Sequence, residues 1–285
     1  MFTRRSLPTR YNFLPMSDAP GRLSPQLTVP PQQRVYFASD FHLGSPDWKS
    51  SRVREDKIVR WLNTIRQDAH TIFLLGDIFD FWFEYQSVVP KGYLRLLGTL
   101  ADLVDHGTQL YLFTGNHDLW MFDYFSQELG VPIVRYPVSL QINDRHFHLG
   151  HGDGLGPGDR TYKLLKKVFV SRWGQRLFKL VHPDWGITFA QRWSARSRRK
   201  NLTKDESFRT KEEEWIYQYC VEVEERQHHD YYIFGHRHLV LDIPLNENSR
   251  YINTGEWITT GHYACYDGQE LSVRAYDDRP EGNLS

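Results

Sequence analysis

The chain has 285 residues, of which 40% are hydrophobic and 25% charged, and its 35 basic residues balance 35 acidic ones. This composition is that of a globular protein with one large domain or two small ones, and it excludes a disordered or membrane-embedded chain. No stretch approaches 18 uninterrupted apolar residues, so no transmembrane helix is expected. The two cysteines, Cys220 and Cys265, form no CxxC pair, which argues against a disulfide framework and suits a reducing cytosol.

The first 33 residues scatter arginines among prolines and lack the apolar run of a signal peptide. We therefore predict a flexible leader over residues 1–33, within which Met16 is an alternative start. Beyond it, strands are expected over residues 34–39, 71–75 and 109–113. Helices are expected over residues 55–69 and 94–104, where apolar residues recur at spacings of three and four. These two β-α-β units predict a parallel sheet at the start of the fold.

The pattern then changes to short strands. Asn143-Asp144 lies between two apolar runs, over residues 138–142 and 146–149, and predicts a tight hairpin. Five more strands are expected over residues 231–234, 240–243, 250–253, 262–266 and 271–275. Together the elements predict an α/β sandwich of two mixed sheets.

Residues 155–225 have helical patterning and few strand signals, and they predict an inserted helical cap. Twelve Lys or Arg but only two acidic residues lie between positions 159 and 200. Within residues 162–181, Leu165, Phe169, Trp173 and Leu177 recur at spacings of three and four and form one apolar face. Such a basic, aromatic, amphipathic segment can lie on an anionic membrane surface. The alternative is that the apolar face packs on the protein's own core and the charges are solvated.

The predicted organisation is a leader, a body, the inserted cap and a short tail, over residues 1–33, 34–154 with 226–277, 155–225, and 278–285. A nucleic-acid partner is not expected, because the basic residues are concentrated in the cap and the net charge is zero.

Five polar clusters each follow a predicted strand, which is where sites form in open α/β sheets. They are Asp40-x-His42, Gly76-Asp77, Gly115-Asn116-His117-Asp118, His151-Gly152-Asp153 and Gly235-His236-x-His238. Each cluster alone is a weak signal, since a histidine at a strand end is more often structural and a Gly-Asp pair is more often a turn. Together they offer carboxylate, amide and imidazole donors without a thiolate. This donor set suits Mn, Fe, Co or Zn and argues against a structural zinc site of the Cys type.

The order and spacing of the clusters resemble the calcineurin-like metallophosphoesterase superfamily, whose pattern is D-x-H, GD, GNH-D/E, a later H and GH-x-H. The resemblance implies a four-layer sandwich of two mixed sheets flanked by helices, and a pair of divalent ions. One ion would take Asp40, His42, Asp77 and His238. The second would take Asp77, Asn116, His151 and His236, so that Asp77 bridges the two. Such a pair lowers the pKa of a shared water and neutralises phosphoryl oxygens during hydrolysis.

His117 follows a predicted ligand and is expected near the same phosphate. We predict that it stabilises charge in the transition state or protonates the leaving oxygen. In the GD-x-x-D variants of the superfamily a second acid orients this histidine, and Asp80 stands at that position here. Asp118 is the alternative partner of His117, and Asp80 could instead cap the segment that follows it.

The runs FASDFHLG, GDIFDFWFEY, FTGNHDLWMFDYF and GHGDGLGPGDRTYK resemble the UDP-2,3-diacylglucosamine pyrophosphatases of bacterial lipid A synthesis, over residues 34–257. This resemblance implies manganese as the metal, and cleavage of a UDP-linked diacyl sugar to UMP and a diacylglucosamine 1-phosphate. We therefore expect a cytoplasmic enzyme, peripheral on the inner face of the cytoplasmic membrane. The aromatic residues at 79–85 would border the substrate pocket or simply pack in the core.

Two other functions are kept open. The best-known branch of that family has Arg where this chain has His117, so a related phosphoesterase with another nucleotide-linked or phosphodiester substrate is the first alternative. A scaffold that kept the fold and lost catalysis is the second. Such scaffolds usually lose metal ligands, whereas all seven predicted ligand side chains are present in this sequence.

Overall fold

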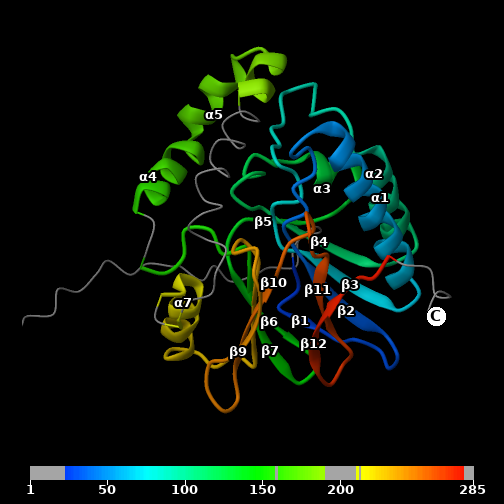
Figure 1. Ribbon diagram of the computed structural model, residues 1–285, viewed down its shortest axis with the longest axis vertical. Helices are drawn as coiled ribbons and strands as arrows, with labels where there is room; N and C mark the ends of the chain where they lie inside the picture. Colours follow the sequence, from blue (N-terminus) through cyan, green and yellow to red (C-terminus); the bar gives the residue numbers. More distant parts are fainter. Residues whose placement is uncertain (1–22, 158–159, 190–209, 212, 279–285) are drawn as a thin grey trace, which may run out of the picture.

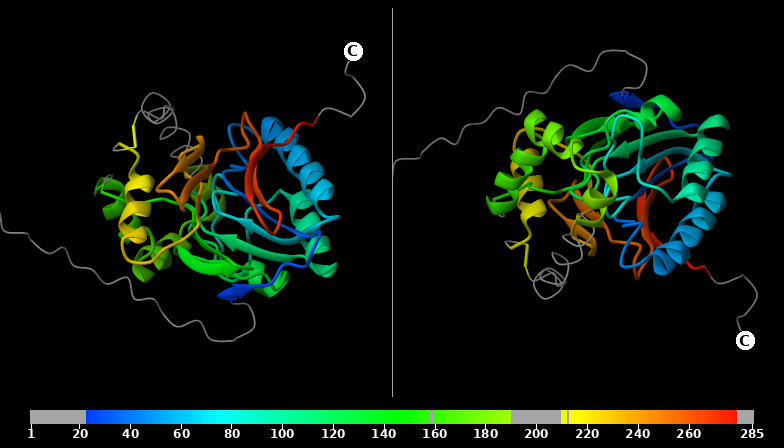
Figure 2. Two further views of the ribbon diagram at one scale, coloured as in Figure 1. Left: turned by 90° about the horizontal axis from the view of Figure 1, so that it is seen from below. Right: turned by 90° about the horizontal axis from the view of Figure 1, so that it is seen from above.

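The structure is a computed structural model, and it describes residues 23–157, 160–189, 210–211 and 213–278. Two six-stranded sheets face each other, and helices cover the outer face of each sheet (Figures 1 and 2). The predicted four-layer α/β sandwich is therefore confirmed. Among the residues described, no helix is both long enough and apolar enough to cross a lipid bilayer.

The sheet nearest the start of the chain has the order β12-β11-β2-β3-β4-β5. Its strands are β2 (Arg34–Ala38), β3 (Ala69–Leu74), β4 (Gln109–Phe113), β5 (Ile133–Val134), β11 (His262–Tyr266) and β12 (Leu271–Ala275). Strands β2 to β5 run parallel, and β11 joins β2 in the antiparallel direction. Helices α1 (Trp48–Ile65) and α2 (Leu94–Asp105) pack on the outer face, so both predicted β-α-β units are confirmed. A short helix, α3 (Tyr124–Glu128), follows β4.

The second sheet has the order β1-β6-β7-β8-β10-β9. Its strands are β1 (Gln26–Leu27), β6 (Val138–Ile142), β7 (Arg145–Gly150), β8 (Tyr231–Phe234), β9 (Val240–Pro244) and β10 (Arg250–Thr254). The predicted hairpin joins β6 to β7, and Asn143 takes the left-handed conformation (φ 51°) that its turn requires. Helix α7 (Trp215–Glu224) covers the outer face, where Ile216 and Cys220 pack against Tyr232 and Tyr251.

Alternation along the strands fills the space between the sheets with aromatic side chains. In β2, Val35 and Phe37 face the second sheet, whereas Tyr36 and Ala38 face the helices. Phe37 stacks on Phe73 with ring centroids 5.3 Å apart. This close-packed interior is the rigid base that carries the strand ends.

Several predicted boundaries are wrong. The helix predicted over residues 55–69 ends at Ile65, because Ala69 already begins β3. Residues 23–33 are not a flexible leader, because Leu23, Leu27 and Val29 are buried and β1 pairs with β6; residues 1–22 lie outside the described part. Helix α1 begins seven residues earlier than predicted, because the side chain of Asp47 accepts the N–H of Ser50 (2.9 Å) as an N-cap. The cap does not extend to residue 225, because α7 packs on the second sheet as a layer of the body.

The cap consists of α4 (Arg160–Phe169), α5 (Arg172–Lys179) and a helical stretch over residues 183–189. The amphipathic segment predicted over residues 162–181 is broken in two, because Ser171 accepts the N–H of Gly174 (3.0 Å) and caps α5. Five of the twelve basic residues counted between positions 159 and 200, namely those at positions 192–200, lie outside the described residues.

Candidate metal centre

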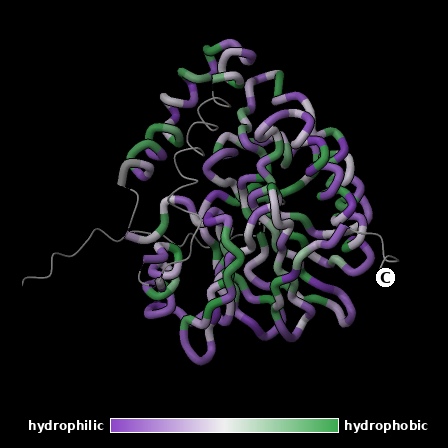
Figure 3. The backbone as a smooth tube through the Cα atoms, in the orientation of Figure 1, coloured by the Kyte–Doolittle hydropathy of each residue, from purple (hydrophilic) through white to green (hydrophobic). Residues whose placement is uncertain are grey.

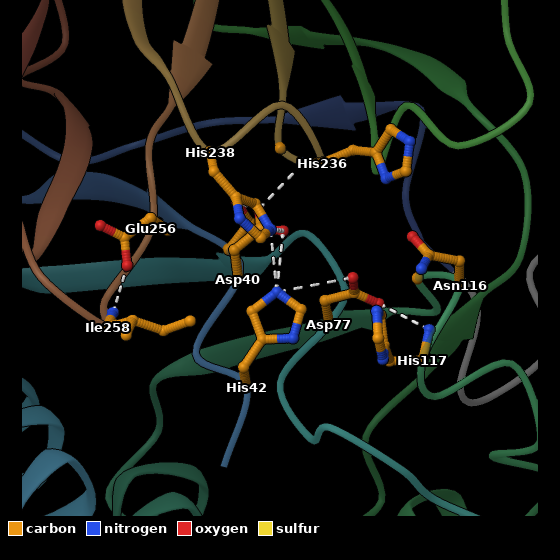
Figure 4. Close-up of polar contacts among 12 residues, drawn as sticks. Asp40, His42, Asp77, Asn116, His117, His236, His238, Glu256 and Ile258 are labelled. Carbon is orange, nitrogen blue, oxygen red and sulfur yellow. Dashed lines mark hydrogen bonds and ion pairs between the residues drawn. The ribbon is translucent and has the colours of Figure 1, made fainter. Parts of the chain in front are cut away.

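The five predicted clusters meet at one edge of the sandwich. Three follow neighbouring strands of the first sheet, and two follow neighbouring strands of the second. The side chains that meet there are Asp40 and His42 after β2, Asp77 after β3, Asn116 and His117 after β4, His151 after β7, and His236 and His238 after β8. Because parallel strands end at the same edge, residues almost 200 positions apart come together (Figure 4).

Asp40, His42 and His238 form the first group of ligand atoms. The Nε2 atoms of His42 and His238 lie 2.9 Å apart. Oδ1 of Asp40 lies 3.1 Å from Nε2 of His238 and 3.5 Å from Nε2 of His42. Asp40 and His42 are fully buried, and Oδ1 of Asp40 has no hydrogen-bond partner among the described residues. A buried carboxylate oxygen that faces two imidazole nitrogens is the environment that a divalent cation fits.

Asp77, Asn116, His151 and His236 form the second group. Nε2 of His151 lies 3.2 Å from Oδ1 of Asn116 and 3.4 Å from Oδ2 of Asp77. His236 contributes a nitrogen within 4.8 Å of the Asp77 and His151 atoms. The other ring nitrogen of His151, Nδ1, lies 2.9 Å from the carbonyl oxygen of Leu75, which fixes the orientation of this ring.

Asp77 lies between the two groups, as Figure 4 shows. Its Oδ2 is 3.4 Å from Nε2 of His151 in the second group and 3.8 Å from Nε2 of His42 in the first. Its Oδ1 accepts the main-chain N–H of His117 (2.8 Å). One oxygen of this buried carboxylate therefore faces both groups, which is the position of a ligand shared by two ions.

His117 and Asp80 lie beside the first group. Nδ1 of His117 is 3.0 Å from the main-chain oxygen of Asp80, so this nitrogen carries the proton of the neutral ring and Nε2 carries the lone pair. Oδ1 of Asp80 lies 3.7 Å from the Nδ1 atoms of both His117 and His42. The sequence predicted that the carboxylate of Asp80 orients His117; in the structure its main-chain carbonyl is the nearer partner.

Asp118, the alternative partner of His117, has a different place. Its buried carboxylate accepts the N–H groups of Gly115 (2.7 Å) and Ile78 (2.8 Å). It therefore ties the loop after β3 to the loop after β4, and so holds Asp77 and Asn116 in register.

Five of the ligand residues take the left-handed backbone conformation that non-glycine residues rarely adopt. They are Asp40 (φ 57°), His42 (45°), Asp77 (53°), His236 (69°) and His238 (54°). Each such residue costs about 1–3 kcal/mol, so this much strain in one place marks a site that the surrounding fold has fixed. The neighbouring backbone is equally constrained: a Cβ atom on Gly115 would lie 2.1 Å from Oδ1 of Asp77.

The sequence reasoning missed two supporting residues. Arg54 of α1 is buried and donates to the carbonyl oxygens of His42 (2.6 Å) and Ser45, which holds the loop after β2 in place. The sequence does contain a sign of this role: Arg54 lies on the apolar face of its helix, four residues before Ile58. Ser39 donates to Oδ2 of Asp40.

Burial and charge set the protonation of the site. Burial lowers the pKa of His236 and of His117 to about 4, so both imidazoles are neutral at pH 7. Burial also opposes a charge on His151, but the carboxylates of Asp77 and Asp40 raise its pKa to about 10. Burial opposes a charge on Asp77 as well, yet the imidazoles of His151 and His117 hold its pKa well below the usual range. A divalent ion here would displace the proton of His151, because metal ligands must be deprotonated.

Aromatic side chains join the cap to the loops beside the metal centre. Phe178 of α5 contacts Phe83 (centroids 4.6 Å apart) and Trp120 (4.8 Å). The indole N–H of Trp120 donates to the carbonyl oxygen of Phe169 in α4 (2.8 Å). The aromatic residues at 79–85 therefore have two environments. Phe83 contacts the cap, whereas Phe79 and Trp82 pack in the core of the body.

The chain is similar in sequence to known phosphoesterases. A family profile described as calcineurin-like phosphoesterase matches residues 33–240. The UDP-2,3-diacylglucosamine hydrolase of Porphyromonas gingivalis is 34% identical over 259 residues, which cover 87% of this chain and 99% of the relative. The protein of the same name from Ralstonia nicotianae is 29% identical over 182 residues, which cover 64% of this chain and 66% of the relative. Among solved structures, the phosphoesterase Yfce from E. coli matches 85% of this chain and 92% of its own, with 16% identity and a TM-score of 0.41.

Proposed function

The chain belongs to the calcineurin-like phosphoesterase family, and we propose that it cleaves the pyrophosphate bond of UDP-2,3-diacylglucosamine, giving UMP and 2,3-diacylglucosamine 1-phosphate. This reaction belongs to lipid A biosynthesis. The observation that carries the metal chemistry is the position of Asp77, with one oxygen facing both ligand groups. The relative from Porphyromonas gingivalis supports the substrate, because its match spans nearly all of both chains.

The residues of the site fit two divalent ions. The first ion would be held by Asp40, His42, Asp77 and His238, and the second by Asp77, Asn116, His151 and His236. When bound, such a pair supplies Lewis-acid polarisation of the phosphoryl oxygens and a water of lowered pKa. A set of carboxylate, amide and imidazole donors without thiolate suits Mn, Fe, Co or Zn, and manganese is the ion we propose among them because of the resemblance to the UDP-2,3-diacylglucosamine pyrophosphatases. Reconstitution of metal-free protein with Mn²⁺, Fe²⁺, Co²⁺, Zn²⁺ or Mg²⁺, each scored for turnover, tests this choice.

The chain's own groups do the remaining work. His117 is neutral at pH 7 and donates its Nδ1 proton to the main-chain oxygen of Asp80, so its Nε2 carries a lone pair; it would take up a proton during the reaction and could then give that proton to the leaving oxygen. Arg54 and Asp118 keep the ligand loops in place. We propose that the acyl chains lie against Phe83, Trp120 and Phe178, the aromatic side chains through which the cap contacts the body.

The cap is the surface that we propose for contact with an anionic membrane. Its apolar side chains Trp173, Leu180 and Trp185 are 79%, 82% and 76% exposed. Hydrophobic and hydrophilic stretches alternate along this part of the chain (Figure 3). Basic residues lie among the apolar ones, namely Arg172, Arg176 and Lys179. Because a lipid-linked substrate resides in the bilayer, we place the enzyme on the cytoplasmic face of the inner membrane, as a peripheral protein.

A related phosphoesterase with another nucleotide-linked or phosphodiester substrate is the second candidate, and His117 is the residue that favours it. A panel of substrates separates the two. The purified protein, with Mn²⁺ present, is given UDP-2,3-diacylglucosamine, UDP-N-acetylglucosamine and bis(p-nitrophenyl) phosphate. We expect the diacylated substrate to have the highest kcat/KM and to release UMP. Preferred turnover of either compound without acyl chains would favour the second candidate.

A further inference from the structure

A buried carboxylate next to the metal centre is joined to the cap. Asp153 follows His151 by two residues, and its side chain is only 6% exposed. Its Oδ2 accepts a hydrogen bond from the hydroxyl of Tyr162 (2.5 Å) and pairs with Nζ of Lys166 (2.5 Å). Both partners belong to α4, the first helix of the cap. Lys166 also donates to the main-chain oxygen of Asp153 (3.3 Å).

The loop that carries Asp153 has little freedom to move alone. Gly152 and Gly154 on either side of it have φ of 117° and 72°, in the region that favours glycine. A Cβ atom on Gly152 would lie 2.6 Å from Ile216 of α7, so the loop passes close to the body. Lys163 of α4 donates to the carbonyl oxygen of Gly156 in the same loop. The loop is therefore a fixed point on the body to which α4 is attached.

The spacing on α4 shows that these contacts share one face. Tyr162 and Lys166 are four residues apart, so they lie side by side on the helix. Lys167, the next residue, is exposed, and Val168 is 53% exposed. Lysine side chains at a surface usually extend into water, whereas the ammonium group of Lys166 covers the buried carboxylate of Asp153.

We propose that Asp153, Tyr162 and Lys166 form a latch that positions the cap over the metal centre. Asp153 acts as a positioning residue. It holds α4 in place, and α4 in turn sets where the acyl chains lie relative to the phosphate that the ligand residues bind. This inference rests on the proposed function, because it assigns the cap to the recognition of the acylated substrate. A latch of this kind changes turnover of the large substrate but not of a small diester that needs only the metal centre.

The test compares Lys166→Met and Asp153→Asn with the matched control Lys167→Met, which removes the same charge from the same helix one position away. Each protein is assayed on UDP-2,3-diacylglucosamine and on bis(p-nitrophenyl) phosphate, and its metal content is measured. For the two latch variants we expect kcat/KM on the lipid substrate to fall roughly 10- to 100-fold, because the substrate is misplaced. Turnover of the diester and metal content should stay at the wild-type level.

Two further variants distinguish a latch from general destabilisation. Lys166→Arg should restore most of the lipid activity, and the double variant Asp153→Asn/Lys166→Met should lose no more than the worse single variant, because both break one interaction. Equal losses on both substrates, or a loss of metal, would show that Asp153 only maintains the metal loop. Unchanged lipid activity would also overturn the latch.

A second measurement keeps this inference separate from the proposed function. Amide hydrogen exchange should be faster in α4 of Lys166→Met than in the wild type or in Lys167→Met, because α4 would detach from the body. If the wild-type protein does not hydrolyse the lipid substrate, the proposed function fails, and exchange alone decides whether the latch exists. Unchanged exchange in α4 would then contradict it.

Discussion

At the scale of single residues, the metal centre was predictable because its ligands are polar residues that directly follow strands. Asp40, His42 and Asp77 all lie where the sequence placed them. Supporting residues were not predictable in the same way. Arg54 binds main-chain carbonyl groups, so no motif of side-chain types contains it. Asp118 is part of the GNH-D/E motif, but the motif does not reveal that its carboxylate binds main-chain N–H groups.

Asp77→Asn is the residue substitution with the largest expected effect. It removes the negative charge from the one oxygen that faces both ligand groups, so both ions lose affinity. We expect turnover to fall by roughly 100-fold or more and the metal content to fall below that of the wild type. Elemental analysis after gel filtration, together with UMP release, measures both. Near-normal turnover with two ions retained would exclude Asp77 as a shared ligand.

His117→Ala should have the opposite signature. His117 forms a third group of close ligand atoms with His42 and Asp80, but its Nδ1 donates to the main-chain oxygen of Asp80, and it belongs to neither of the two proposed ligand sets. Its loss should therefore leave the metal content unchanged. Because it acts on the phosphoryl group, we expect kcat to fall by about 10²–10⁴-fold. Loss of metal in this variant would mean that His117 is a ligand, and an unchanged kcat would mean that it has no part in catalysis.

At the scale of helices and strands, periodicity predicted the long elements and failed for the short ones. β4, β6, β8, β11 and β12 have the predicted bounds. The two-residue strands β1 and β5 were missed, because two residues cannot show an alternation. The start of α1 was missed because its first two turns are mostly polar. The break between α4 and α5 was missed because the apolar residues keep a helical spacing on both sides of Ser171, so the pattern does not show the break.

The exposed apolar residues of α5 make the membrane proposal testable. Trp173→Glu combined with Leu180→Glu places two charges on the cap, whose wild-type side chains are 79% and 82% exposed. We expect co-sedimentation with vesicles rich in anionic lipid to decrease at least tenfold, since burial of apolar area and charge attraction both weaken. Leu94→Glu is the control, because Leu94 is 78% exposed on α2 of the body. Equal losses in the two proteins would locate membrane contact elsewhere.

A buried pair of histidines behind the second sheet predicts acid sensitivity. His148 of β7 and His229 both lie within hydrogen-bond distance of the hydroxyl of Ser139 (2.9 and 2.8 Å). Burial lowers the pKa of His148 to about 3 and that of His229 to about 4, whereas both are near 6.5 in the unfolded chain. The unfolded state therefore binds more protons, so stability falls as pH decreases from about 6.5 to 4.

At pH 5 we expect each of these histidines to lower the free energy of unfolding by about 1–2 kcal/mol relative to pH 7. Urea unfolding of the metal-free protein at the two pH values measures the difference. His148→Gln keeps hydrogen-bonding groups and removes one titrating site, so the difference should shrink. The exposed His146→Gln is the control. The same pH dependence in wild type and His148→Gln would show that His148 does not cause it.

At the scale of the whole molecule, two sheets must meet for the site to exist. The first sheet supplies Asp40 and Asp77, and the second supplies His151 and His236. The order of motifs predicted this meeting only through a resemblance, because pairing between distant strands has no local signal. Bound ions should therefore stabilise the assembled sandwich against unfolding.

Removal of metal should lower the melting temperature. The ions bind the folded state alone, and five strained ligand residues lose their compensation without them. We expect excess EDTA to lower Tm by roughly 5–15 °C, and Mn²⁺ in excess of the chelator to restore it. Asp77→Asn should show a smaller decrease. An identical Tm with and without chelator in the wild type would be inconsistent with ions held by these ligands.

The most direct test of the central claim is the release of UMP from UDP-2,3-diacylglucosamine as Mn²⁺ is added stepwise to metal-free protein. A shared-ligand centre predicts that UMP release is absent at first and reaches its plateau when two ions are bound per chain. Full activity in the metal-free protein, or no UMP once two ions are bound, would contradict the account.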